Sequence, residues 1–250
     1  MAALLSLIGV THRYSRGVRE VTVLHDISLD LKEGDYACVL ASKDEGKTTL
    51  LEVAAGIRTP NEGRVMFQGR DLATMSKGAR TRLLRSEIGC VWNRSVPVVI
   101  GESVLAHVGL PLRSARVERK ERRRRAAAMI ERVGAADYAD AKVLDLSQSQ
   151  RMRVALAQAC VRSPRLLIAD ELTDTLDLIE RTKLLGLLQD FARDGMCVLM
   201  TAPDGHGAKG CNRLLSLSDG RLKEAEVRPP TPIESADADV VPFRTRTGGE

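Results

Sequence analysis

Short apolar runs alternate with segments of helical periodicity along most of the chain. The apolar runs predict strands at residues 3–9, 20–30, 35–41, 64–68, 88–92, 165–170, 196–201, 213–217 and 221–226. Apolar residues spaced three and four apart predict helices at residues 46–55, 76–86, 113–133, 147–162 and 178–193. Strand patterns dominate the first 70 residues, and strands alternate with helices after that. This order predicts an α/β fold in which a mixed sheet packs against a parallel α/β core.

Strand patterns become rare between about residue 93 and residue 162, where helical patterns prevail. We therefore expect a helical lobe inserted between core strands. The composition changes again near the end, because residues 227–250 are rich in Pro, Asp, Ser and Gly and show no apolar period. Such a segment cannot bury enough apolar surface to fold. We expect one folded domain over residues 1–226, followed by a disordered tail.

The composition argues against several classes of protein. Hydrophobic residues make up 44% of the chain, which is enough for a core. No apolar run approaches the ~18 residues that a membrane-spanning helix needs. The apolar start MAALLSLIGV has no basic segment or cleavage pattern, so we expect a first strand and not a leader. Aromatic residues make up only 3%, which disfavours stacking on nucleic-acid bases. Five cysteines without a CxxC pair indicate reduced thiols in a cytosolic protein.

The basic excess of the chain lies in one segment. The net charge is +5, and residues 113–132 hold nine Arg or Lys against three Glu. One interpretation is a surface for nucleic acid or anionic lipid. The other is a solvated helix whose Arg and Glu side chains pair across one helical turn. Glu118, Glu121 and Glu131 interrupt the basic run, which favours the solvated helix, and we expect no nucleic-acid partner.

A stretch typical of a phosphate-binding loop follows the predicted strand at 35–41. It ends in Gly46-Lys47-Thr48-Thr49 and leads into a predicted helix, and this order of strand, loop, GK[ST] and helix is what the motif requires. The backbone amides of the helix N-terminus would hold phosphates. Lys47 would reach the β- and γ-phosphates, and Thr48 would bind Mg²⁺. The alternative is a chance junction of loop and helix.

This loop departs from the motif GxxxxGK[ST] in two ways. Ala41 stands at the first glycine, and Lys43, Asp44 and Glu45 leave the interior of the loop without glycine. We expect strain, because a non-glycine residue at positive φ costs roughly 1–2 kcal/mol. Asp44 and Glu45 also place negative charge beside the phosphates, so we expect weakened nucleotide binding.

An acidic pattern later in the chain supports the interpretation of the GKT sequence as a phosphate-binding loop. The apolar strand RLLIADE ends in two carboxylates, Asp170 and Glu171. Asp170 would complete the Mg²⁺ shell, and Glu171 would orient the attacking water. A strand that ends in a solvated acidic turn is the alternative for either residue alone. Together with the GKT sequence, the pair predicts a nucleoside triphosphate site.

Taken in order, these motifs resemble those of ATP-binding cassettes, the nucleotide-binding subunits of ABC transporters. Tyr14, in THRY, matches the aromatic residue that stacks on adenine in that family. Residues 146–171 resemble its signature motif and Walker B strand, and residues 172–177 (LTDTLD) resemble its dimer-contacting D-loop, with Asp177 in place. Segments such as VLHDISLDLKEGD look most like the lipoprotein-release and macrolide-export cassettes.

The resemblance covers roughly residues 3–225. It implies a P-loop (RecA-like) ABC ATPase core with an antiparallel β lobe and an inserted helical lobe. It implies a membrane-spanning transporter subunit and a second nucleotide-binding subunit as partners, in a homo- or heterodimer on the cytoplasmic face of the cell membrane. It also implies ATP and Mg²⁺ as ligands, with the metal at Thr48 and Asp170 and the phosphates at Ala41, Gly46, Lys47, Thr48 and Thr49.

Several motif positions differ from the family pattern. Asn93 stands where the family has a glutamine that reaches Mg²⁺ and the lytic water. The signature LSGGQ reads LSQSQ here, so Ser147 is kept, but Gln148 and Ser149 replace glycines that cap the γ-phosphate of the opposite subunit. Pro203 stands at the switch histidine and cannot donate a hydrogen bond to the γ-phosphate.

These departures cluster around the γ-phosphate, where loss of one positioned donor typically slows turnover by ~10²–10³. We therefore expect a degenerate cassette that binds ATP but hydrolyses it weakly or not at all. One alternative is a fully active ATPase that works as a homodimer. The other is a soluble pseudo-ATPase scaffold. An intact partner cassette would favour the first interpretation.

Overall fold

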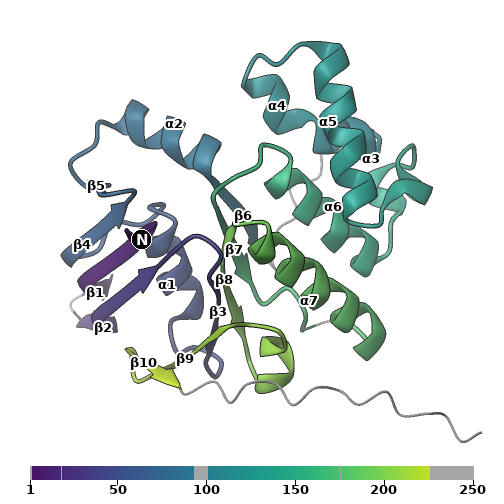
Figure 1. Ribbon diagram of the computed structural model, residues 1–250. Helices are drawn as coiled ribbons and strands as arrows, with labels where there is room; N and C mark the ends of the chain where they lie inside the picture. Colours follow the sequence, from purple (N-terminus) through teal and green to yellow (C-terminus); the bar gives the residue numbers. More distant parts are fainter. Residues whose placement is uncertain (1, 18, 93–100, 175, 226–250) are drawn as a thin grey trace, which may run out of the picture.

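The computed structural model describes residues 2–17, 19–92, 101–174 and 176–225. Figure 1 shows a small sheet at one side, a larger sheet through the middle and a group of helices at the other side. Asn93 and the tail expected to be disordered lie outside the described residues. No helix in the described ranges is both long and apolar enough to cross a membrane.

The small sheet is antiparallel and has the strand order β2-β1-β4-β5. Its first strand was expected to end at residue 9 but continues to Arg16, because the mostly polar residues 10–16 pair with the second strand through the backbone. This extension carries Tyr14, which pairs with Val21. The strands are β1 (Leu5–Arg16), β2 (Arg19–Leu31), β4 (Glu62–Phe67) and β5 (Arg70–Asp71).

The larger sheet has the order β10-β9-β3-β8-β7-β6 and is parallel except for β10. Its central strands are buried on both faces, which explains their continuous apolar sequences. The strands are β3 (Tyr36–Leu40), β6 (Ile88–Trp92), β7 (Leu166–Asp170), β8 (Cys197–Ala202), β9 (Arg213–Ser218) and β10 (Arg221–Ala225). Four helices lie near their predicted positions: α1 (Lys47–Ala54), α2 (Lys77–Glu87), α6 (Gln148–Cys160) and α7 (Leu178–Arg193).

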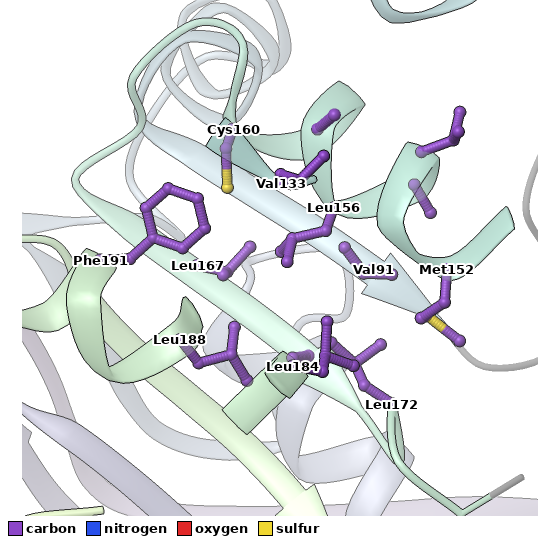
Figure 2. Close-up of a cluster of buried hydrophobic side chains, with 14 of the residues drawn as sticks. Val91, Val133, Met152, Leu156, Cys160, Leu167, Leu172, Leu184, Leu188 and Phe191 are labelled. Atoms are coloured by element: carbon purple, nitrogen blue, oxygen red, sulfur yellow. The ribbon is translucent and has the colours of Figure 1, made fainter. Parts of the chain in front are cut away.

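Alternate residues of β7 face two separate hydrophobic cores. Leu166 and Ile168 pack in one core with α1 and the small sheet. Leu167 packs in the other core, where Figure 2 shows it between side chains of two helices, among them Leu156 and Leu188. The sheet therefore packs against a hydrophobic core on each face, and this packing fixes the position of the carboxyl end of β7.

Four helices lie in the part of the chain where we expected a helical lobe: α3 (Val104–Val108), α4 (Leu110–Ser114), α5 (Arg119–Arg132) and α6 (Gln148–Cys160). Two short 3-10 turns, Ala136–Tyr138 and Val143–Asp145, connect α5 to α6. The single helix expected at 113–133 is wrong, because Arg116 adopts a left-handed φ of 59° and ends the helical path between α4 and α5. The helices α3 and α4 were not predicted, since five residues are too few to show a helical period.

The five cysteines are free thiols in the structure. Four are buried and Cys90 is partly buried. Burial raises the pKa of Cys90, Cys160 and Cys197 to about 12. These thiols are therefore protonated and unreactive at neutral pH, as expected for packing residues.

His107 of α3 is a fully buried polar residue in the helical part. Neither of its ring nitrogens has a hydrogen-bond partner among the described residues. Burial lowers the pKa of His107 below its ordinary value, and the nearby Glu102 opposes this only in part. Burial therefore favours the neutral imidazole in the fold, and its protonation would place a charge in the core without a hydrogen-bond partner among the described residues.

We predict that His107→Leu reduces the loss of stability on acidification. As pH falls through about 6.5, the unfolded chain takes up a proton that the fold resists, so the free energy of unfolding drops by up to about 1.4 kcal/mol per pH unit. Urea unfolding measured between about pH 7.5 and about pH 5 should show that the free energy of unfolding falls less in the variant than in the wild type. His12, whose pKa burial also lowers, accounts for what remains.

The matched control is His206→Leu, because His206 is exposed. This substitution should leave the pH profile of stability unchanged. An unchanged profile in His107→Leu, or an equal change in both variants, would contradict a role for the buried imidazole.

Candidate functional site

A cleft of about 840 Å³ opens where β3 and β7 end and α1 begins. Its walls come from the small sheet, from the loop before α1 and from the segments that follow β7 and β8. The residues that line it are Tyr14, Val21, Val23, Lys43, Asp44, Gly46, Lys47, Thr48, Thr49, Asp170, Glu171, Asp174 and Pro203. The carboxyl ends of parallel strands are the usual place for ligands in open α/β sheets.

The loop before α1 has a conformation that only part of its sequence suits. Gly46 caps the helix with a φ of 93°, and a Cβ at this position would lie 2.7 Å from Val23 Cγ1, so glycine is required. Asp44 also has a positive φ, of 67°, whereas Ala41 does not. The strain expected at the missing first glycine is therefore absent at Ala41 and falls on Asp44, a residue type that tolerates this conformation better than most.

Lys47 lies at the first position of α1 and is buried, with only 7% of its surface exposed. Its Nζ donates to the carbonyl oxygen of Ala41 at 2.8 Å and forms an ion pair with Glu171 Oε1 at 2.5 Å. Glu171 has a left-handed φ of 48°, and its backbone N–H donates to Thr201 Oγ1 at 3.1 Å. The loop lysine and the carboxylate that follows β7 are thus in direct contact.

Asp170, the last residue of β7, is held by two hydroxyl groups. Thr48 Oγ1 donates to Oδ2 and Thr201 Oγ1 donates to Oδ1, each at 2.8 Å. The hydroxyl of Thr48 and the carboxylate of Asp170 are the hard oxygen ligands that Mg²⁺ prefers. The described residues contain no group of three His, Cys, Asp or Glu that could hold a metal alone. The two oxygens therefore fit a magnesium ion whose other ligands are phosphates and water.

Tyr14 lines the cleft from β1, and its ring is fixed on several sides. Its hydroxyl lies 3.1 Å from Thr49 Oγ1, and the ring of His12 meets it edge-on at 5.0 Å. The guanidinium of Arg58 lies 4.9 Å from the centre of the Tyr14 ring. Arg58 is itself held by Glu52 at 2.6 Å, and this hydrogen bond raises the pKa of Arg58. A cation on one face and an open cleft beside the ring suit Tyr14 to stack on a flat heterocycle.

Asp174 is a cleft residue that the sequence analysis did not single out. Burial raises the pKa of Asp174, and the negative charge of Glu171 raises it further. Pro203 lines the same cleft and has no N–H to offer a ligand. Asp174 lies in the LTDTLD segment, which resembles a dimer contact and in which only Asp177 was assigned a role, so nothing in the sequence pointed to Asp174 as a residue of the chain's own cleft.

Other predicted residues lie outside this cleft. Ser147 caps α6, where its side chain accepts from the amide of Gln150 in a reciprocal capping box. Gln148 is the first residue of that helix. Asp177 caps α7 and accepts from the amide of Glu180 at 2.9 Å. None of the three is among the residues that line the cleft.

The family model described as "ABC transporter" matches residues 24–174. Among curated proteins, macrolide export ATP-binding/permease protein MacB 2 of Aeromonas hydrophila is 29% identical over 92% of this chain. Methionine import ATP-binding protein MetN 1 of Rhodococcus jostii is 35% identical over 79% of it. The matched regions make up 35% and 58% of these relatives, so the chain spans only part of their length.

Solved structures lead to the same family. The dimeric ATP-binding cassette MJ0796, in a post-hydrolysis state with ADP and Pi, has a TM-score of 0.83 and 27% identity, covering 90% of this chain and 99% of that one. CbiO1 from Clostridium perfringens, a part of the transporter complex CbiONQ, has a TM-score of 0.80 and 25% identity. The match covers 89% of this chain and 88% of CbiO1. The fold predicted from the motifs, a P-loop ABC ATPase core, is confirmed. With a family model that matches 24–174 and relatives of the same kind, the chain belongs to the ABC transporter family.

Proposed function

We propose that this chain is the nucleotide-binding subunit of an ABC transporter, and that it binds MgATP in the cleft but hydrolyses it weakly or not at all. The observation that carries the proposal is the convergence of Lys47, Thr48, Asp170 and Glu171 in one cleft that Tyr14 also lines. The proposal includes a membrane-spanning partner and a second nucleotide-binding subunit, with the chain on the cytoplasmic face of the membrane.

Each of these residues has a defined task in holding the nucleotide. The amides of the first turn of α1 and the ammonium of Lys47 would hold the phosphates. Thr48 and Asp170 would hold Mg²⁺, which neutralises the charge of the phosphates. Tyr14 would stack on the adenine, with Arg58 fixing its ring from the other side.

Two observations support slow hydrolysis. Glu171 forms an ion pair with Lys47, so it must leave this contact before it can orient a water molecule. Asp174, which lies near Glu171 and Lys47, adds a carboxylate to the cleft, and Pro203 lines the cleft without an N–H to donate to the charge that develops in the transition state. Binding without efficient turnover is the combination that this geometry favours.

Relatives of this chain support the assembly. MJ0796 is described as a dimer and CbiO1 as a part of a larger complex. Ser147 and Gln148 at the start of α6 are exposed and lie outside the chain's own cleft, which is consistent with a contact to the cleft of a second subunit. The relatives include an exporter and an importer, so the direction of transport stays open.

A second candidate is a fully active ATPase that works as a homodimer. It is favoured by the intact contact of Asp170 with Thr48 and by the presence of Lys47 and Glu171 in the same cleft. In that case the altered residues around the γ-phosphate would be tolerated variation.

We predict that the purified protein releases phosphate from ATP at close to the background rate. Glu171→Gln removes the general base, so it should change this rate little if turnover is already lost. The measurement is steady-state phosphate release by the wild type and by Glu171→Gln, together with the ATP affinity of each protein. Robust turnover that Glu171→Gln abolishes would overturn the degenerate function in favour of the active homodimer.

We predict that two substitutions separate phosphate binding from base binding. Lys47→Ala should weaken the binding of both MgATP and inorganic tripolyphosphate by tenfold or more, about 1.4 kcal/mol, because the ammonium contacts the phosphates. Tyr14→Leu should weaken MgATP binding several-fold and leave tripolyphosphate unchanged, because only the base meets the ring.

Calorimetric titration of each variant with both ligands checks this prediction. The control is Lys209→Ala, an exposed lysine outside the cleft. If Lys47→Ala binds ATP as the wild type does, the cleft is not the nucleotide site.

We predict that Asp44→Gly tightens MgATP binding several-fold. Glycine adopts the positive φ of residue 44 without cost, and the substitution removes a carboxylate beside the phosphates. Ala41→Gly is the matched control, since Ala41 has no positive φ to relieve. Equal effects of the two substitutions on ATP affinity would show that backbone strain and charge at Asp44 are unimportant.

A further inference from the structure

Two elements at one end of the fold are rich in basic residues. In Figure 1, α2 and the α4–α5 segment both lie at the upper end. Residues 113–132 hold nine Arg or Lys, and α2 contributes Lys77, Arg80, Arg82 and Arg85. We call the basic side chains of α2 and of residues 113–132 the basic surface.

Most of these cations are not neutralised inside the protein. Glu121 pairs with Arg124 at 2.7 Å and with Arg125 at 2.6 Å, and Arg132 pairs with Asp194. The other six basic residues of this segment have no carboxylate within 4.0 Å in the described part of the chain: Arg113, Arg116, Arg119, Lys120, Arg122 and Arg123. Pairing across helical turns, the explanation that the sequence favoured, therefore accounts for only Arg124 and Arg125.

The first turn of α5 places cations where the helix does not favour them. Arg119 and Lys120 stand at its N-terminus, and the positive end of the helix macrodipole disfavours cations there. Both side chains are exposed, as is Arg123 one turn later. Their charge is thus unfavourable for the isolated helix and available to a partner outside the protein.

The basic surface can attract a partner through charge but cannot insert into one. No large exposed hydrophobic side chain lies on α2, α4 or α5 in the structure described here. Aromatic side chains are also absent from these helices, so bases have nothing on which to stack. The chemistry fits an anionic surface that is contacted through its phosphate groups.

We propose that the basic surface binds the anionic headgroups of the membrane on which the transporter works. The choice of a membrane rests on the proposed function, whereas the need for an anionic partner rests on the unpaired cations alone. Each Lys or Arg close to an anionic bilayer contributes about 1 kcal/mol, so a few of these residues give measurable attachment. This contact would turn one end of the cassette toward the bilayer.

Co-sedimentation with vesicles tests the proposal. The vesicles are phosphatidylcholine alone, or phosphatidylcholine with about one third phosphatidylglycerol, at ionic strengths of about 0.1 M and about 1 M. The protein should bind only the anionic vesicles and should be released at high salt. The variant Arg119→Glu/Lys120→Glu/Arg123→Glu should lose at least tenfold in this affinity.

The control variant is Lys32→Glu/Lys209→Glu/Arg221→Glu, which changes the net charge equally at exposed sites outside the basic surface. It should keep most of the vesicle binding. Acidic residues suit the N-terminus of α5, so the test variant should remain folded, and its MgATP affinity checks this.

Three outcomes would overturn the proposal: no binding to anionic vesicles, equal binding to neutral vesicles, or equal loss in test and control variants. Binding of duplex DNA without binding of anionic vesicles would assign the basic surface to nucleic acid instead. Vesicle binding by a protein that does not bind ATP would refute the proposed function but would still support binding of the basic surface to anionic membranes.

Discussion

The carboxylate of Asp170 joins three elements of the core at one point. Thr48 on α1 and Thr201 on β8 each donate a hydrogen bond to it, and Asp170 itself ends β7. Only 7% of this residue is exposed, and a buried charge is tolerated only where donors satisfy it. The start of α1 is therefore tied to the sheet, and the loop that precedes it has a fixed position. The position of Lys47, which directly precedes Thr48 in α1, depends on this arrangement.

The ion pair between Lys47 and Glu171 is the second interaction that determines what the cleft can bind. Lys47 lies between the carbonyl of Ala41 and the carboxylate of Glu171, so the two groups that suit phosphate binding and water activation contact each other. A phosphate that binds the ammonium group of Lys47 must compete with the carboxylate of Glu171. With Asp174 close by and Pro203 unable to donate, the cleft is better suited to holding a nucleotide than to cleaving it.

Charge is distributed unevenly over the protein. The cleft gathers carboxylates from the ends of strands, whereas α2 and α5 gather unpaired cations at one end of the fold. Asp170 is held by two hydroxyls and Glu171 by Lys47, whereas most cations of the basic surface have no carboxylate partner in the described residues. Internal pairing therefore explains these two carboxylates, and the proposed contact with an anionic membrane would explain the basic surface.

Much of this could be predicted from the sequence. Continuous apolar runs predicted the buried strands, because a parallel strand covered on both faces leaves no polar positions. The GKT sequence and the two acids of RLLIADE predicted Lys47, Thr48, Asp170 and Glu171 as one site, since both motifs follow strands of the same sheet.

Tertiary structure alone decided the rest. The end of β1 that carries Tyr14 lies beyond the apolar residues of the strand and is held by backbone pairing with β2, and the break between α4 and α5 depends on one left-handed residue, Arg116. Loop strain falls on Asp44 and not on Ala41, because φ depends on the path of the chain and not on a motif position. The contact of Lys47 with Glu171 and the place of Asp174 beside them join residues more than 120 positions apart, and distances of that kind exist only in the folded chain.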